Sequence, residues 1–237
     1  MRGVLYLIPS YLSESNDASF IAPMVKDVLQ NTSHFLVENV RTARRFISSL
    51  KLGLDISELQ FEVMDKSTDA QSVEQLMKLL TDGHDLGVIS EAGLPGLADP
   101  GNVAVSWAHR NNVRVIPLPG ASSIQMALIG SGFNGQQFAF HGYLPIDKRE
   151  RTQKIKQLEA EVNRTSYTQI FMETPFRNDQ MVSAILATCN ANTRFSIACD
   201  ISGKNELIQS KTIQEWKKAS PSLHKIPTIF SLGTYPA

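Results

Sequence analysis

The sequence has little cysteine, and its two cysteines form no recognisable motif. Cys189 and Cys199 are the only ones among 237 residues, without a CxxC pair or a histidine-rich neighbour. This pattern argues against a disulfide framework and against a zinc site, so we expect no metal. Reduced cysteines are typical of a cytoplasmic protein.

Excess charge and long apolar runs are absent as well. Twenty-three basic residues balance twenty-three acidic ones, so no overall positive field draws the chain to nucleic acid or to an anionic membrane, although a local basic patch stays open. No apolar run approaches the roughly 18 residues of a membrane span. The run from Val4 to Ile8 is too short for a signal peptide. We therefore expect a soluble globular protein with no membrane contact.

Short apolar runs alternate with segments of helical periodicity, which predicts an α/β fold. In the first half we expect strands at 3–8, 34–37, 59–63, 86–89 and 113–116, with helices at 20–29, 41–50, 67–81 and 103–110. In the second half we expect helices at 122–131, 148–164 and 178–188, with strands at 138–144, 168–172, 195–199, 207–208 and 228–232. Strands follow one another more directly there, which favours a partly antiparallel sheet. We predict two domains, 1–118 and 119–237.

Two loops at predicted strand ends are candidates for ligand contact. The segment SEAGLPGLADPG (residues 90–101) follows a strand and leads into a helix, which is where open α/β sheets bind ligands. Its glycines permit close backbone approach, and Glu91 and Asp99 supply carboxylates. A sharp strand-to-helix turn with no ligand is the simpler alternative. Neither GxGxxG nor GxxxxGK[ST] occurs there, so the segment does not indicate a phosphate site.

The second loop, PLPGASS (residues 117–123), also lies between a strand and a helix. Its exposed amide groups could hydrogen-bond a carboxylate. Simple capping of the helix by serine is again an alternative. Two such loops in one chain strengthen the ligand interpretation.

Four blocks in a fixed order carry a resemblance to a known family. SEAGLPGLADPG, PLPGASSIQMALIGSGF, FAFHGYLP with KRER close behind, and IFMETPFR together resemble the tetrapyrrole methylase family. They are most similar to its branch that methylates a ribose 2′-oxygen in small-subunit ribosomal RNA. The resemblance covers roughly residues 3 to 232. It implies two α/β domains with the methyl donor, S-adenosylmethionine, in the cleft between them.

The resemblance also implies where that donor binds. Pro9 lies at the end of the first expected strand, and the loop at residues 90–95, which follows the strand expected at 86–89, resembles the donor-binding loop of the family. Contacts to the donor are then expected from Pro9, Ser90, Glu91, Ala92, Gly93, Leu94, Pro95, Ser122, Ser123, Phe171, Met172, Pro227 and Thr228. Phe171 and Met172 would pack near the adenine. The family implies a homodimer too, to which we expect Phe46, Trp107 and Phe133 to contribute.

The chain departs from the ribose-methylating branch at the segments expected to face the acceptor. Ser10-Tyr11-Leu12-Ser13 replaces a usual Gly-Asn-Leu turn, and the second strand is followed by Glu38-Asn39-Val40-Arg41 where Glu-Asp-Thr-Arg is usual. Residues 200–206 replace a usual Glu-Leu-Thr-Lys segment, and Glu91 stands where aspartate is usual. Donor binding should survive the exchange of one carboxylate for another. These departures leave the acceptor open.

Methyl transfer to a hydroxyl benefits from a base or a cation near the acceptor oxygen. Candidates on the expected cleft rim are Glu38, Arg41, Glu173 and Arg177, each of which has local pairing or a solvated helix face as an alternative role. Arg41, Arg44, Arg45, Lys148, Arg149 and Arg151 could contact RNA phosphates. His141 is expected to be a packed residue and not a base.

The sequence leaves three readings. The first is an S-adenosylmethionine-dependent methyltransferase related to the enzymes of 16S rRNA cytidine 2′-O-methylation. The second is a methyltransferase that acts on a carbon of a corrin or porphyrin. The third is a protein that binds the donor without catalysis, which the altered loops at residues 10–13 and 38–41 suggest.

Overall fold

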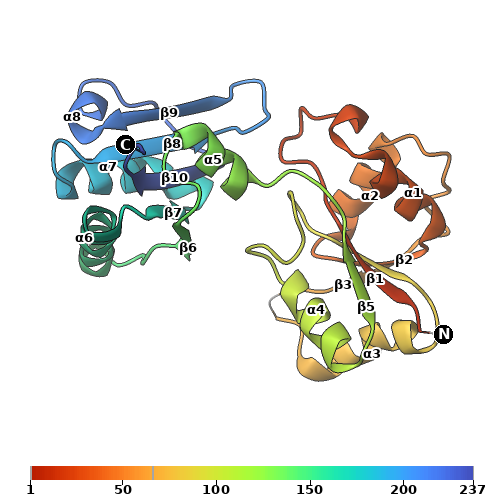
Figure 1. Cartoon of the computed structure of the whole chain (residues 1–237). Helices are drawn as coiled ribbons and strands as arrows, with labels where there is room; N and C mark the ends of the chain where they lie inside the picture. The colour runs from red at the N-terminus through yellow and green to blue at the C-terminus, as the bar shows by residue number, and fades with distance from the viewer. Residues whose placement is uncertain (1, 66, 237) are drawn as a thin grey trace. The chain divides into compact units, whose positions relative to one another are not determined.

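The computed structural model describes residues 2–65 and 67–236. The chain divides into two compact units, one ending at Ser122 and the other beginning at Ser123. Each unit contains one five-stranded sheet covered by helices (Figure 1). This architecture agrees with the α/β fold of two domains that the sequence predicts.

The N-terminal unit contains a fully parallel sheet. Its elements in chain order are β1 (Val4–Ile8), a 3₁₀ turn η1 (Ala18–Phe20), α1 (Pro23–Asn31), β2 (His34–Val37), α2 (Val40–Ser49), β3 (Gln60–Val63), α3 (Ala70–Thr81), β4 (Leu86–Ile89), α4 (Gly101–Arg110) and β5 (Arg114–Pro117). The strands lie in the order β3-β2-β4-β1-β5. Each carboxyl end therefore points to the same edge of the sheet.

Helices cover both faces of this sheet, as Figure 1 shows. The central strands are buried on both sides, so they read as continuous apolar runs. Leu5 and Leu7 of β1 pack on one face with Met77 and Trp107 of α3 and α4. Ile8 packs on the other face with side chains from α1 and α2. The helices that follow β1 and β2 cover one face of the sheet, and those that follow β3 and β4 cover the other. In open α/β sheets, ligands bind at the carboxyl ends of the strands, where the connections change from one face to the other.

The C-terminal unit contains a mixed sheet. Its elements are α5 (Ser123–Ser131), β6 (Phe138–Tyr143), α6 (Lys148–Thr165), β7 (Thr168–Met172), a 3₁₀ turn η2 (Pro175–Arg177), α7 (Asn178–Thr188), β8 (Arg194–Cys199), β9 (Leu207–Thr212), α8 (Ile213–Trp216) and β10 (Thr228–Gly233). The strand order is β6-β7-β10-β8-β9. Only β6 and β7 pair in parallel, while β10 and β9 run antiparallel to their neighbours. The predicted mixed sheet is confirmed.

One large core supports this second sheet. Ile155 and Leu158 of α6 and Ile185 of α7 pack against Phe171 and Phe230 of the strands. The helix α6 is strongly charged, yet one face of it is buried and Asp147 caps its first turn by accepting from two backbone amides. The helix α5 contacts β7, β8, β9 and β10.

Most of the predicted strands and helices match the observed ones to within two residues. The exceptions are α1 and α3, which each begin three residues later than predicted, the strand β9, which is longer, and the short helix α8 and the two 3₁₀ turns, which were not predicted. The first helix begins at Pro23 and not at Phe20, because Asp17 caps a separate 3₁₀ turn and proline favours the first helical position. The strand predicted at 207–208 extends to Thr212, where pairing with β8 outweighs its polar composition. None of the helices within residues 2–65 and 67–236 has the length and apolar character needed to cross a bilayer.

The three residues expected at a dimer interface lie inside the units. Phe46, Trp107 and Phe133 are buried in the chain itself, and Trp107 belongs to the core between the first sheet and α4. They therefore cannot serve as exposed contacts for a second copy.

Candidate functional site

Three loops meet at the carboxyl edge of the parallel sheet. They follow β1, β4 and β5, and they contain Pro9, residues 90–95 and Gly120. A Cβ atom on Gly120 would lie 2.2 Å from Cβ of Pro9, and one on Gly93 would lie 3.1 Å from the Ala121 carbonyl oxygen. Glycine is thus required where these backbones approach closely.

Hydrogen bonds hold the loop between β4 and α4 against the end of β1. The Ser10 hydroxyl donates to the Ser90 carbonyl oxygen at 2.9 Å, and the Ser10 amide donates to the Gly93 carbonyl oxygen at 2.9 Å. The Ser90 hydroxyl donates to the same Gly93 oxygen at 3.1 Å. Gly93 adopts φ +73°, a conformation that glycine adopts without strain. The loop therefore has a defined shape before any ligand binds.

The two carboxylates of this loop have different surroundings. Asp99 accepts from the amides of Gly96 and Gly101, so it shapes the turn into α4. Glu91 is exposed, and its backbone amide donates to Glu38 Oε1 at 3.4 Å. The structure thus brings the candidate Glu38 next to the predicted donor loop, with Asp99 in a structural role.

Arg41 lies in the first turn of α2, which begins beside Glu38. Asn39 caps this helix by accepting from the amides of Arg41 and Thr42. Arg41 is exposed.

A cavity of about 360 Å³ lies beside the predicted donor loop within the N-terminal unit. Its walls come from the segment after β1, from α2 and from the end of β4. They comprise Ser10, Tyr11, Leu12, Ser13, Glu14, Asn16, Thr42, Ala43, Arg45, Phe46, Ser49, Ile89, Ser90, Glu91 and Ala92. Sequence reasoning identified the segment 10–13 as altered but did not predict that it forms a pocket with α2.

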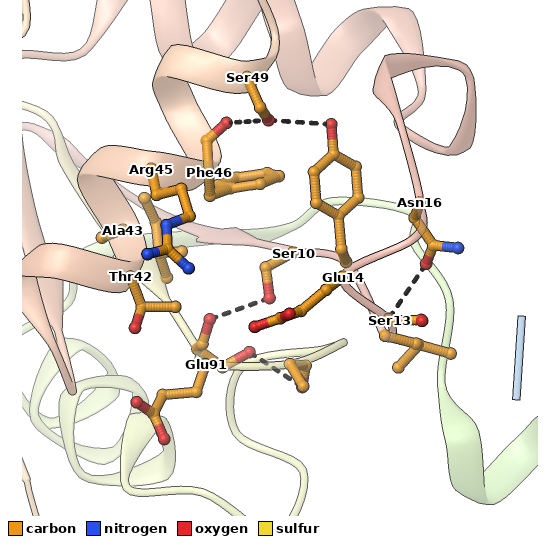
Figure 2. Close-up of a pocket in the computed structure, with 15 residues that line it drawn as sticks. Ser10, Ser13, Glu14, Asn16, Thr42, Ala43, Arg45, Phe46, Ser49 and Glu91 are labelled. Carbon is orange, nitrogen blue, oxygen red and sulfur yellow. Dashed lines mark hydrogen bonds between the residues drawn. The ribbon is translucent and has the colours of Figure 1, made fainter. Parts of the chain in front are cut away.

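The upper wall of the cavity is an aromatic pair. The rings of Tyr11 and Phe46 meet edge to face with centroids 5.0 Å apart. The Ser49 hydroxyl lies 3.2 Å from the Tyr11 hydroxyl oxygen and 2.7 Å from the Phe46 carbonyl oxygen (Figure 2). The aromatic pair and this hydroxyl contact give that wall a fixed geometry.

Charged side chains also line the cavity. Figure 2 shows the Arg45 guanidinium and the Glu14 carboxylate turned toward its interior, with Glu91 at its rim. Asn16 accepts from the Ser13 amide at 3.1 Å, which holds the segment after β1 in a turn. The cavity therefore combines an apolar aromatic wall with a few convergent polar groups.

The predicted donor contacts of the C-terminal unit lie mostly at one end of its sheet. Met172 ends β7 and pairs with Ile229, directly after Thr228 on β10. Thr228 is buried and accepts from the Asn178 side-chain amide at 3.2 Å. Pro227 is exposed, whereas Phe171 is fully buried against Phe230 in the core. Ser122 is buried at the end of the N-terminal unit, and Ser123 begins α5.

Glu173 and Arg177 form a local ion pair. Arg177 donates to Glu173 Oε1 at 2.6 Å, and the Thr174 amide donates to the same oxygen at 2.6 Å. The Glu173 side chain is 1% exposed. A buried carboxylate needs such partners, so the pair stabilises the turn after β7.

The basic residues near α6 and α2 divide by burial. Lys148 and Arg149 are exposed, whereas Arg151 is buried and donates to the Ile146 carbonyl oxygen at 2.8 Å. Arg151 therefore cannot reach RNA phosphates, contrary to expectation. On α2, Arg44 lies over the Phe61 ring and Arg45 lines the cavity.

His141 is half-buried and lies 2.8 Å from Gln169 Oε1 through its Nε2 atom. Burial lowers the pKa of this imidazole below its usual value, against an opposing effect of the Gln169 hydrogen bond. Within the described residues, no group of three or more His, Cys, Asp or Glu side chains is arranged to hold a metal ion.

The chain is similar over most of its length to curated ribosomal RNA methyltransferases. It is 26% identical to the ribosomal RNA small subunit methyltransferase I of Buchnera aphidicola over 94% of this chain and 76% of that protein. The enzyme of the same name from Bacillus subtilis is 29% identical over 90% of this chain and 68% of that protein. No model of a known protein family matches the chain.

Solved structures share the fold at low sequence identity. Uroporphyrin-III-C-methyltransferase from Thermus thermophilus superposes with a TM-score of 0.56 at 15% identity, over 98% of this chain and 93% of that one. Diphthine synthase gives a TM-score of 0.68 at 12% identity, over 98% and 89%. The chain shares the fold of these methyltransferases and is similar in sequence to ribosomal RNA small subunit methyltransferase I.

These similarities confirm the family resemblance inferred from the four sequence blocks, and they confirm the methyltransferase class. Sequence similarity connects the chain to the ribosomal RNA branch, while the solved structures establish the fold alone. The residues that would hold the donor and the acceptor stay predictions.

Proposed function

We propose that this methyltransferase uses S-adenosylmethionine and transfers its methyl group to a ribose 2′-oxygen of small-subunit ribosomal RNA. The observation that carries the proposal is the rigid, glycine-bearing loop at the carboxyl edge of the parallel sheet, in a chain whose sequence relatives are ribosomal RNA methyltransferases. Ligands of open α/β sheets bind at that edge.

The donor is proposed to lie along residues 90–95, next to Pro9. Ser10 and Ser90 fix the backbone of this loop by hydrogen bonds, and Gly93 lets it pass close to Leu12 and Ala121. Such a preformed surface avoids the entropy cost of ordering a loop on binding. Ser122 and Ser123, together with Phe171, Met172, Pro227 and Thr228, are proposed as further donor contacts. Because Phe171 is buried, its contribution would come through its backbone.

The bound donor would supply an electrophilic methyl group on a sulfonium. The acceptor oxygen forms the new bond to carbon as the carbon–sulfur bond breaks, its electron pair goes to sulfur, and the hydroxyl proton passes to a base or to water. The protein must hold the acceptor in line and exclude competing water. We propose that Glu38 positions the donor loop through the Glu91 amide and that Arg41 stabilises charge on the acceptor side.

Two alternatives follow from the same fold. A tetrapyrrole carbon is the acceptor in the solved relative that methylates uroporphyrin III, but identity of 15% does not transfer that substrate. Binding of the donor without catalysis is the other. An acceptor screen separates these three possibilities.

Isothermal titration with S-adenosylmethionine and S-adenosylhomocysteine tests the donor site. We expect saturable binding that is weakened by Glu91→Ala and unchanged by Glu62→Ala, which removes an exposed carboxylate on the edge strand β3. Absence of saturable binding to the wild-type chain would refute the donor proposal. If both variants bound S-adenosylmethionine with the same affinity, the proposed role of Glu91 would be refuted, but the donor site itself would not.

A cytoplasmic location and a homodimer stay predictions. Sedimentation velocity of the purified chain tests the second, with a single species of twice the chain mass as the expected result.

A further inference from the structure

The cavity beside the donor loop shares a wall with it. Ser90, Glu91 and Ala92 line the cavity and also belong to the proposed donor loop. A molecule in this cavity would therefore lie next to a donor bound at residues 90–95. The volume of about 360 Å³ is within the range of small-molecule pockets.

The shape of the lining fits a flat ring. Tyr11 and Phe46 present aromatic surface on one side, supplemented by Leu12, Ala43 and Ile89. Bases taken out of a strand are held in proteins by stacking on aromatic side chains. Tyr11 is half-buried and its hydroxyl lies 3.2 Å from the Ser49 hydroxyl, so its ring is held in place.

The polar groups of the lining fit a ring that both donates and accepts hydrogen bonds. Arg45 offers donors only, Glu14 offers acceptors, and the hydroxyl of Thr42 can do both. Figure 2 shows the Arg45 and Glu14 side chains directed into the space below the aromatic pair. The edge of a nucleobase carries donors and acceptors side by side and can use both side chains at once.

The charges of the lining argue against an anionic occupant. Two carboxylates, Glu14 and Glu91, face a single cation, Arg45, among the lining residues. A porphyrin or corrin precursor carries several carboxylates, which would bring like charges into the cavity. A phosphate would meet the same repulsion. An uncharged heterocycle avoids both.

We infer that this cavity receives the base of the acceptor nucleotide, turned out of its strand and stacked against Tyr11 and Phe46, with Arg45 and Glu14 bound to its edge. This inference rests on the proposed function, because it assigns the acceptor of the same reaction. Because a ribose is bonded directly to its base, the sugar of a nucleotide whose base occupied this cavity would lie near the cavity, of which Ser90, Glu91 and Ala92 form one wall.

A tryptophan reporter tests the inference directly. The native tryptophans, Trp107 and Trp216, are buried at 3% and 1% exposure, so Tyr11→Trp adds one fluorophore in contact with the cavity. Cytidine, adenosine and uroporphyrin III are titrated into the variant with saturating S-adenosylhomocysteine, with the wild-type chain as correction for absorbance. We expect saturable quenching by at least one nucleoside and none by uroporphyrin III.

A matched pair of arginine variants tests the polar contact. In the reporter background, Arg45→Gln is expected to weaken nucleoside binding roughly tenfold or more, because a hydrogen bond to a charged group is lost. Arg44 lies on the same helix over the Phe61 ring and is not among the residues that line the cavity. Arg44→Gln should therefore leave the dissociation constant for the nucleoside unchanged. Circular dichroism of both variants checks that they fold.

The outcomes separate this inference from the donor proposal. Saturation by uroporphyrin III, or only linear quenching by each nucleoside up to its solubility, would overturn the nucleobase assignment. Titration of the reporter variant with S-adenosylhomocysteine by calorimetry shows independently whether the donor site is intact. If the variant binds S-adenosylhomocysteine but no nucleoside saturates it, the nucleobase inference is refuted and the proposed function is not.

Discussion

The Ser10 hydroxyl donates to the carbonyl oxygen of Ser90 at 2.9 Å, and this bond joins the ends of two adjacent parallel strands. Both residues are buried, with exposures of 5% and 6%. The contact fixes the relative position of the proposed donor loop and the segment that lines the cavity. Altering it should affect both.

Ser10→Ala is therefore expected to lower the free energy of unfolding by about 1–3 kcal/mol, because a buried carbonyl oxygen loses its partner. Chemical denaturation measures this change, and calorimetry should show weaker S-adenosylmethionine binding in the same variant. Ser183→Ala removes an exposed hydroxyl that donates to the Asp179 carbonyl oxygen within α7. Its stability should stay within about 0.5 kcal/mol of wild type; an equal loss in both variants would contradict a special role for Ser10.

Gly120→Ala is expected to disturb the meeting point of the three loops. The new methyl group would lie 2.2 Å from Cβ of Pro9, so one of the two backbones must shift. We predict a loss of about 1–3 kcal/mol from overpacking and weakened donor binding. Gly135→Ala is the control, since no heavy atom beyond Gly135 and its two chain neighbours lies within 4 Å of the position that its added Cβ would take. Denaturant midpoints of the two variants that coincide would show that the close approach is unimportant.

Arg177→Ala should lower the free energy of unfolding while changing the affinity for S-adenosylmethionine little. When Arg177 is removed, the buried Glu173 carboxylate keeps the Thr174 amide as its one side-chain hydrogen-bond partner among the described residues. Loss of a charged hydrogen bond costs about 1.5–3 kcal/mol. Arg164→Ala breaks an exposed pair with Glu161 and should cost less than about 1 kcal/mol. Abolished methyl transfer with unchanged unfolding would instead indicate a catalytic role for Arg177.

Stability should fall as the pH is lowered below neutrality. Burial is the main cause of the lowered pKa of His141, and burial with the nearby His84 lowers that of His34. Because the folded pKa is depressed, the unfolded chain binds protons first as pH falls below its ordinary pKa of about 6.5. As the pH is lowered from about 7.5 to about 5, the melting temperature of His141→Gln should fall less than that of the wild-type chain. An identical decline in the variant would contradict this role for His141.

Much of the fold follows from local sequence pattern. The strands β2, β4 and β7 and the helix α7 were predicted at their observed bounds. For β2 and β4 this was possible because continuous apolar runs mark strands buried on both faces. The strand β9 was predicted too short, since Gln209, Ser210 and Lys211 look like a loop. Their extended conformation comes from pairing with β8, which no local pattern records.

The candidate site was predictable only in part. Glycine and proline mark the loops at residues 90–101 and 117–120, and parallel strand order brings those loops to one edge. The cavity depends on contact between Tyr11 and Phe46, which are far apart in sequence and meet only when α2 packs on the sheet. Charge pattern misled at Arg151, because a basic side chain in a charged helix looks solvated although its position faces the core.

Transfer of tritiated methyl groups from S-adenosylmethionine is the most direct test of the central claim. Small ribosomal subunits that lack the modification, isolated 16S rRNA and uroporphyrinogen III are offered as acceptors, with the Glu91→Ala variant in parallel. Label in a 2′-O-methylated nucleoside of the RNA, reduced in the variant, is the result we predict. Label in the tetrapyrrole, or no label in any acceptor by a chain that binds the donor, would contradict the claim.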